Sequence, residues 1–128
     1  MKIKSTKTLT RKLDEIFSKY IRKRDTNKQG YIKCYCGKII TYEEADASHF
    51  VSRQHLSTRY DEQNVHASCR HCNRFLEGNK EDYSLFLIQK YGCEIIEKLN
   101  KKKYEVCYNF PFEEKIEYYK NKVKELDK

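Results

Sequence analysis

The sequence contains few of the large apolar residues that fill most protein cores. Tryptophan is absent, and Leu, Ile, Val and Phe together supply only 28 of the 128 residues. This share is about 22%, close to the level of about 20% below which highly charged chains tend to stay disordered. Eleven tyrosines add apolar area, but we expect a thin core that depends on a bound metal for folding.

Long apolar segments are also missing. The N-terminal segment MKIKSTKTLTRK lacks the apolar stretch of a secretory signal, and no apolar run approaches the roughly 20 residues that cross a bilayer. We therefore expect a cytoplasmic protein without a membrane partner. Thiols stay reduced in that compartment, which favours metal binding by the six cysteines over three disulfides.

Acidic residues are outnumbered by basic ones. The chain has 27 Lys and Arg against 19 Asp and Glu, which gives a formal net charge of +8. Such an excess favours a polyanionic partner, with nucleic acid the first candidate, although a merely solvated surface has the same composition. Proline occurs once, and no linker, repeat or low-complexity tract interrupts the chain, so residues 1–128 are predicted to form a single domain.

The spacing of apolar residues predicts an α+β fold. A helix is expected at about residues 8–25, a hairpin at 31–42, strands at 46–51 and 64–67, a short helix at 69–77 and further helices within 80–127. Residues 52–63 are expected to be irregular and 104–110 extended, with Asn79 capping the next helix and Pro111 opening the last one. The last helix has a heptad-spaced apolar stripe, which indicates either packing on its own domain or a homodimer.

Four of the six cysteines form two close pairs, Cys34-x-Cys36 and Cys69-x-x-Cys72. Zinc prefers four thiolate or imidazole ligands in a tetrahedron, and closed four-cysteine sites are structural. The first pair is one residue tighter than usual, which leaves His66 or His71 as an alternative ligand. Cys93 and Cys107 have no such spacing and are predicted to be small core residues.

A histidine and two asparagines, His49, Asn64 and Asn73, overlap the second cysteine pair at intervals of 15 and 9 positions. This pattern resembles the HNH, or ββα-metal, nuclease motif. The resemblance implies that His49 is a general base at the end of a strand and that Asn64 orients it through its backbone. It also implies that Asn73, on the following helix, binds the catalytic metal. A four-cysteine zinc site with Asn directly after the last cysteine is similar to phage junction-resolving endonucleases of this superfamily.

The chain resembles the phage lambda NinG (Rap) recombination-protein family still more closely, over about residues 17 to 100. The matching words are Phe17-Ser-Lys-Tyr-Ile-Arg22, Arg24-Asp25, Cys36-Gly37, Ala47-x-His49-Phe50, Arg59-Tyr-Asp61, Asn64-Val-His66, Cys69-x-x-Cys72-Asn73, Gly78-Asn79, Tyr83 and Tyr91-Gly92. This resemblance implies a metal-dependent DNA endonuclease acting in recombination on branched DNA, in the host cytoplasm if a phage encodes it. It also implies a ββα-metal core at about 31–80 with a structural zinc knuckle, flanked by an N-terminal helix and C-terminal helices.

The sequence departs from the HNH pattern at one ligand position of the catalytic metal, Mg2+ or Mn2+. Many HNH enzymes have an acidic or His ligand immediately before the base, where this chain has Ser48, and a hydroxyl is a poor ligand for these ions beside a carboxylate. Asp46 is the first candidate to complete the site with Asn73, and Glu77, one helical turn after Asn73, is the second.

Three further side chains, Arg53, His55 and Arg59, are predicted to contact DNA phosphates near the cleft, with surface solubility as the alternative. Two other functions use the same residues differently. A catalytically silent, zinc-stabilised DNA-binding module needs the cysteines and the charge but not His49. A protein-interaction module would use the last helix.

Overall fold

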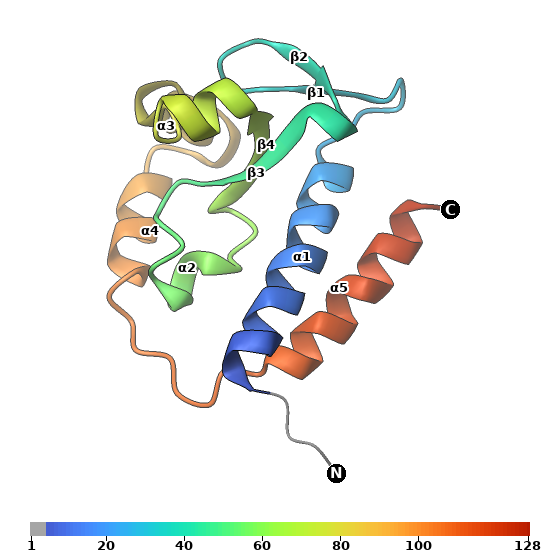
Figure 1. The fold of residues 1–128 in the computed structure, drawn as a ribbon. Helices are drawn as coiled ribbons and strands as arrows, with labels where there is room; N and C mark the ends of the chain where they lie inside the picture. Colours follow the sequence, from blue (N-terminus) through green and yellow to red (C-terminus); the bar gives the residue numbers. More distant parts are fainter. Residues whose placement is uncertain (1–4) are drawn as a thin grey trace.

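The computed structural model describes residues 5–128 and shows the predicted mixture of helices and small antiparallel sheets (Figure 1). The elements in chain order are α1 (Thr6–Arg24), β1 (Tyr31–Lys33), β2 (Ile39–Thr41), the 3-10 turn η1 (Tyr42–Glu44), β3 (Ala45–His49), α2 (Leu56–Arg59), β4 (Val65–Cys69), the short π-helix η2 (His71–Phe75), α3 (Lys80–Tyr91), α4 (Ile95–Lys102) and α5 (Phe112–Leu126).

The first and last helices lie side by side (Figure 1). The hydroxyl of Ser5 caps α1 by accepting a hydrogen bond from the Thr8 amide at 3.2 Å. The buried Phe17 of α1 contacts Tyr119 of α5 edge to face, with ring centroids 4.9 Å apart. The apolar stripe of α5 is therefore covered by α1 of the same chain, except for Leu126, which stays 47% exposed.

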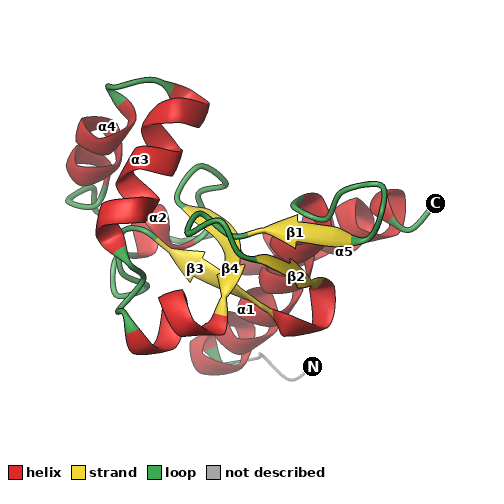
Figure 2. Cartoon of the chain, turned by 90° about the horizontal axis from the view of Figure 1, so that it is seen from above, coloured by secondary structure: helices red, strands yellow, loops and turns green. Residues whose placement is uncertain are grey.

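The strands form two antiparallel hairpins that pack against each other (Figure 2). In the β3–β4 hairpin, Ala45 is opposite Cys69 and His49 is opposite Val65. This register places the first residue of β3 beside the cysteine pair and the last residue at the far end of the sheet. The two predicted sites are thus about one strand length apart.

Among residues 5–128, the core is divided into three small clusters. One lies between α1, α5 and β4, one joins the two hairpins around the cysteines, and one joins Val51 to α3 and α4. This division confirms the expectation of a thin core. Within residues 5–128, no helix combines the length and the apolar content that a bilayer crossing requires.

Several local predictions differ from the structure. Residues 56–59, expected to be irregular, form α2. Residues 104–110, expected to be extended, belong to no helix or strand. Asn79 is the N-cap residue of α3, as predicted, but it has a left-handed backbone (φ 49°) and makes no side-chain cap bond, because its amide faces Asp82 and Cys72 instead. Cys93 and Cys107 are exposed. Single cysteines have no periodicity to place them, so only their usual burial supported the core prediction.

Candidate metal centre and active-site hollow

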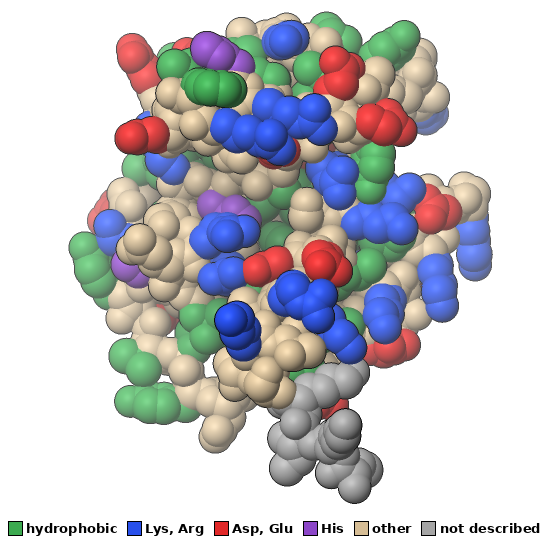
Figure 3. Space-filling model, in the orientation of Figure 1, with side chains coloured by type: hydrophobic (Ala, Val, Ile, Leu, Met, Phe, Trp, Pro, Cys, Tyr) green, Lys and Arg blue, Asp and Glu red, His purple; other side chains and the backbone are tan. Residues whose placement is uncertain are grey.

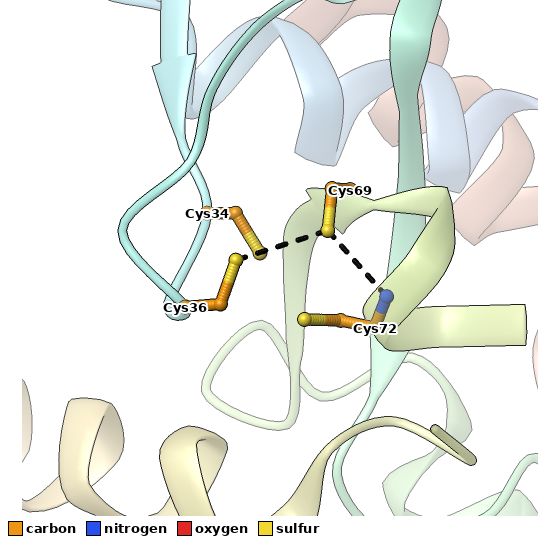
Figure 4. A group of neighbouring side chains, drawn as sticks. All are labelled: Cys34, Cys36, Cys69 and Cys72. Carbon is orange, nitrogen blue, oxygen red and sulfur yellow. Dashed lines mark hydrogen bonds between the residues drawn. The ribbon is translucent and has the colours of Figure 1, made fainter. Parts of the chain in front are cut away.

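The four paired cysteines converge on one point (Figure 4). Their Sγ atoms all lie within 4.8 Å of one another, and those of Cys36 and Cys69 are 3.9 Å apart. Sulfurs on a tetrahedral zinc with bonds of about 2.3 Å are separated by about 3.8 Å. The cluster therefore has the ligand chemistry and nearly the dimensions of a closed zinc site.

The tight first pair fits this geometry because of the turn that follows β1. The Cys34 amide donates to the Lys38 carbonyl at 2.8 Å, and the Gly37 amide donates back to the Cys34 carbonyl at 2.8 Å. Gly37 has a φ of +97°, which a residue with a side chain rarely adopts. The single spacer residue thus allows both Cys34 and Cys36 to face the second pair.

The second pair lies where β4 runs into η2. The Cys72 amide donates to the Cys69 sulfur at 3.4 Å, and the side-chain amide of Asn79 donates to the Cys72 sulfur at 3.4 Å. Such N–H···S contacts favour thiolates. Burial raises the pKa of the Cys72 thiol to about 11 and that of Cys34 further, so a cation is needed to hold these two as thiolates.

His49 ends β3 with its ring held in one orientation. Its Nε2 lies 2.9 Å from the Arg59 carbonyl oxygen. A carbonyl can only accept, so Nε2 carries the proton and Nδ1 is left as the basic nitrogen. Burial lowers the pKa of His49 to about 4; the carbonyl contact opposes this shift and the Arg53 charge adds to it. The imidazole is therefore neutral at pH 7 and able to accept a proton.

Asn64 holds the loop that faces His49 through side-chain hydrogen bonds to its backbone. Its side chain is fully buried; Oδ1 accepts from the Val51 amide at 2.7 Å, and Nδ2 donates to the carbonyls of Val51 and Thr58, both at 3.0 Å. Thr58 directly precedes Arg59, whose carbonyl orients His49. Asn64 thus supports the imidazole through the backbone of the loop between residues 51 and 59.

Asn73 is held by Asp46. Its Nδ2 donates to Asp46 Oδ2 at 3.1 Å, and within residues 5–128 the amide oxygen Oδ1 remains available as a ligand for a cation. Both oxygens of Asp46 also accept from Arg74, at 2.8 and 3.0 Å. These bonds lower the pKa of the half-buried Asp46 against the opposing effect of burial. The carboxylate ranked first for metal binding is therefore engaged by a cationic side chain.

Two adjoining hollows meet at Ala47 and Asn73. The first, here called the His49 hollow, has a volume of about 360 Å³ and is lined by Ala47, His49, Ser52, Arg53, Asn73, Glu77, Gly78 and Lys80. The second, the Asp46 hollow, has a volume of about 420 Å³ and is lined by Ser18, Arg22, Ala45, Asp46, Ala47, Arg70, Asn73 and Arg74. Glu77, the second-ranked carboxylate, thus shares a hollow with His49, whereas Asp46 lines only the neighbouring one.

Glu77 lies in a turn of unusual backbone conformation. Glu77, Gly78 and Asn79 have φ values of 49°, 91° and 49°, all in the left-handed region. The turn is fixed by the Gly78 amide, which donates to the Cys72 carbonyl at 2.8 Å, and by the Tyr35 hydroxyl, which donates to the Gly78 carbonyl at 2.6 Å. A left-handed Glu is strained, and such strain is concentrated at functional sites. The knuckle therefore determines where Glu77 lies.

The three side chains predicted to contact DNA have different surroundings in the structure. Arg53 lines the His49 hollow, whereas His55 precedes α2 and does not line it. The guanidinium of Arg59 is engaged by Asp14 of α1, at 3.0 and 2.5 Å, and by the Arg53 carbonyl at 3.0 Å. Arg59 thus anchors the loop that orients His49, and its charge is already paired.

Lys80 was missed by the sequence analysis. Its ammonium lines the His49 hollow and donates to the carbonyls of His49, at 3.0 Å, and Phe50. No spacing rule marks a lysine that reaches back to the end of a strand 31 residues earlier, so the sequence held no signal for it. Lys and Arg side chains are spread over the face that contains α1 and β3 (Figure 3).

The family model and the similar proteins identify the same family. The sequence matches the family described as "Bacteriophage Lambda NinG protein" over residues 1–128. Over 81 residues, 62% of this chain, it is 30% identical to Protein ninG of Enterobacteria phage H19B and 28% identical to those of Salmonella phage P22 and Escherichia phage lambda. The matched segment spans 38% of the length of these relatives. No solved structure matches. The chain belongs to the NinG family.

Proposed function

We propose that this protein is a metal-dependent DNA endonuclease of the HNH type, in which β3, β4 and η2 form the ββα-metal core. The observation that carries the proposal is the shared lining of the His49 hollow. A neutral imidazole, a carboxamide and a carboxylate lie there together, from His49, Asn73 and Glu77, with two cationic side chains, Arg53 and Lys80. A base, oxygen ligands and phosphate-binding cations are the groups that phosphodiester hydrolysis requires.

The donor set fits a hard cation. Asn73 Oδ1 and the Glu77 carboxylate would hold Mg2+ or Mn2+, because both ions prefer oxygen ligands and keep several waters. When bound, the ion neutralises charge on the scissile phosphate and the leaving 3′ oxygen. Asp46 is assigned a supporting part. By accepting from Asn73 Nδ2, it turns Oδ1 of that residue toward the ligand position.

The side chains divide the remaining work. His49 Nδ1 takes a proton from the attacking water, while the Arg59 carbonyl holds the other ring nitrogen. Arg53 and Lys80 bind the phosphate, and Lys80 also fixes the end of β3 through the His49 carbonyl. The structural zinc keeps the turn that carries Glu77 against the sheet. We extend the proposal to branched or junction DNA, the substrate that the family resemblance implies.

The direct test incubates the purified chain with end-labelled junction, duplex and single-stranded DNA, in Mg2+, Mn2+ or EDTA. Cleavage that requires the divalent ion, leaves 5′-phosphate ends and is fastest on the junction is expected. Binding to all three DNAs with no cleavage under any condition contradicts the proposal. That result would support the silent DNA-binding module, which Ser48 and the pairing of Asp46 with Arg74 favour.

Glu77→Asn separates metal binding from backbone strain. Asn tolerates the left-handed region better than Glu, for which it costs about 1 kcal/mol. The variant should therefore be as stable as wild type or slightly more stable, yet cleave at least tenfold more slowly at low Mg2+. Thermal melting and cleavage rates titrated with Mg2+ measure the two effects. An unchanged rate would exclude Glu77 as a ligand, and Asp46→Asn provides the comparison for the carboxylate ranked first.

The dependence of cleavage on pH tests the state of His49. Its pKa is lowered to about 4, so the fraction of neutral base falls only as the pH drops through that value. Between pH 5.5 and 8 (a window chosen to keep the thiolates metal-bound), His49 should contribute no inflection to the single-turnover rate. An exposed histidine would give one near pH 6.5. An acid limb at about that value, lost in His49→Ala, contradicts the burial argument.

A further inference from the structure

Two stacked rings are exposed on η2, the short helix that also carries Asn73. Phe75 is 76% exposed, which is unusual for so apolar a side chain. The His71 ring, four residues earlier, stacks on it with centroids 5.8 Å apart and an interplanar angle of 26°. The stacking orients the Phe75 ring and leaves most of its surface open. We propose that Phe75 and His71 form a stacking site for an unpaired nucleobase of DNA.

The position of η2 connects this ring pair to the proposed cleavage site. The same short helix carries Asn73, which lines both hollows, and Arg74, which lines the Asp46 hollow. Arg70, directly before η2, lines the Asp46 hollow too, and its side chain is half exposed. Neither ring lines these two hollows. A strand whose phosphates lie along the hollows would reach the ring pair by crossing η2, because His71 and Phe75 are each two residues from Asn73.

Two arginines adjoin the rings in the sequence, Arg70 before His71 and Arg74 before Phe75. Both lie beside Asp46, at 3.9 and 2.8 Å, so the three side chains together keep one net positive charge. An open aromatic face accepts any base, because every base has a π-face, and surfaces that bind single-stranded nucleic acid combine such a face with positive charge. Paired bases inside a duplex are covered by their neighbours, so the rings can stack only on a base at an end, a flap or a junction. The inference rests on the proposed function for the identity of the partner as DNA.

A protein partner fits this surface less well. Standard protein interfaces bury about 800 Å² on each side, with a core from which charged residues are depleted. Here the exposed apolar residues of the segment are Phe75 and Leu76, and arginines adjoin them. One aromatic face next to a basic hollow is the size and chemistry of a single-base contact.

The test measures binding of the full chain to labelled oligonucleotides in EDTA, where cleavage is blocked. Three probes are compared: a fork with unpaired arms, the same fork with abasic arms, and a fully paired duplex of equal length. Phe75→Ala should weaken binding to the fork about tenfold, and binding to the duplex less than twofold. Phe75→Trp should keep the fork affinity, and the abasic fork should bind wild type and Phe75→Ala alike.

Two controls isolate the ring. Leu76→Ala removes a neighbouring, 46% exposed apolar side chain without an aromatic face, and Tyr104→Ala removes a 75% exposed aromatic on the loop between α4 and α5. Both should change fork binding less than twofold. Equal losses on fork and duplex, no loss in Phe75→Ala, or a change in its oligomeric mass would overturn the stacking site.

The outcomes also distinguish this inference from the proposed function. If wild type cleaves DNA but fork preference is unaffected by Phe75→Ala, only the stacking site fails. If wild type binds the fork through Phe75 and never cleaves, only the endonuclease proposal fails. If wild type binds none of the three probes, both fail.

Discussion

Replacing Cys72 by serine is expected to abolish the cooperative unfolding transition of the protein at ordinary temperatures. The Cys72 sulfur is one of four that lie within 4.8 Å of one another. Structural zinc contributes about 10–16 kcal/mol in finger peptides, whereas the whole net stability of a typical domain is about 5–15 kcal/mol. The three small core clusters of the described part of the chain, residues 5–128, provide no comparable stability. Circular dichroism during heating measures the loss.

The chain provides its own matched controls for this experiment. Cys93 and Cys107 are exposed and lie outside the four-sulfur cluster, so Cys93→Ser and Cys107→Ser should melt like wild type. Elemental analysis should find one zinc per chain in wild type and in both controls, and less in Cys72→Ser. Wild-type melting of Cys72→Ser, or purified protein without a transition metal, contradicts the zinc assignment.

Removal of zinc should also disturb the proposed active site. The Cys72 carbonyl accepts from the Gly78 amide, and the Cys72 sulfur accepts from Asn79, so the left-handed turn that carries Glu77 is built on the knuckle. A chelator that strips zinc should therefore abolish cleavage together with the helical signal, and added Mg2+ should restore neither. The two metals would then be separable, because added Mg2+ cannot restore a turn that has lost its anchor.

The pattern of the sequence was sufficient for most of the fold. The helix predicted at 8–25 is α1, the hairpin at 31–42 is β1–β2, and Pro111 directly precedes α5. These elements are encoded locally, by helical periodicity, by turn residues and by the fixed φ of proline. The four cysteines were also identifiable, because two close pairs have few alternatives to a shared metal.

The carboxylate of the proposed catalytic metal site was harder to choose, because the choice depends on contacts between distant segments. Asp46 was ranked first because it lies two residues before Ser48, on the same face of the predicted strand. Its partner Arg74 lies 28 positions later and engages it only after η2 has folded against β3. Glu77 reaches the His49 hollow through a left-handed turn, and a Glu in that conformation has no signature in the sequence. The orientation of Asn73 by Asp46 was equally hidden.

The supporting groups of His49 show the same limit. Its position at the end of β3 follows from strand spacing, but the carbonyl that fixes its tautomer belongs to Arg59, and Asp14 of α1 holds Arg59. Arg59 was predicted to contact DNA because it is basic and close to the motif. Charge in a sequence does not reveal whether an acidic partner is already in place, and Asp14 lies 45 positions away.

His49→Ala is expected to reduce the rate of DNA cleavage by about 10²–10⁴-fold, the usual contribution of a general base, while changing DNA affinity less than twofold. The ring faces a hollow rather than a charged contact, and Nδ1 has no hydrogen-bond partner within residues 5–128, so its loss removes the proton acceptor without removing a cation from the surface. Single-turnover cleavage and binding in EDTA measure the two quantities separately.

The control for loss of an imidazole is His55→Ala, because the His55 side chain does not line the His49 hollow. This variant should cleave DNA at a rate within about threefold of wild type. Added imidazole should partly rescue His49→Ala but not Glu77→Asn, because only the first variant lacks a proton acceptor. The rescued rate should rise with pH across the neutral range, where free imidazole loses its proton, unlike the wild-type rate. If His49→Ala cleaves like wild type, another group activates the water, and the buried, neutral ring of His49 serves only to hold the Arg59 carbonyl in place.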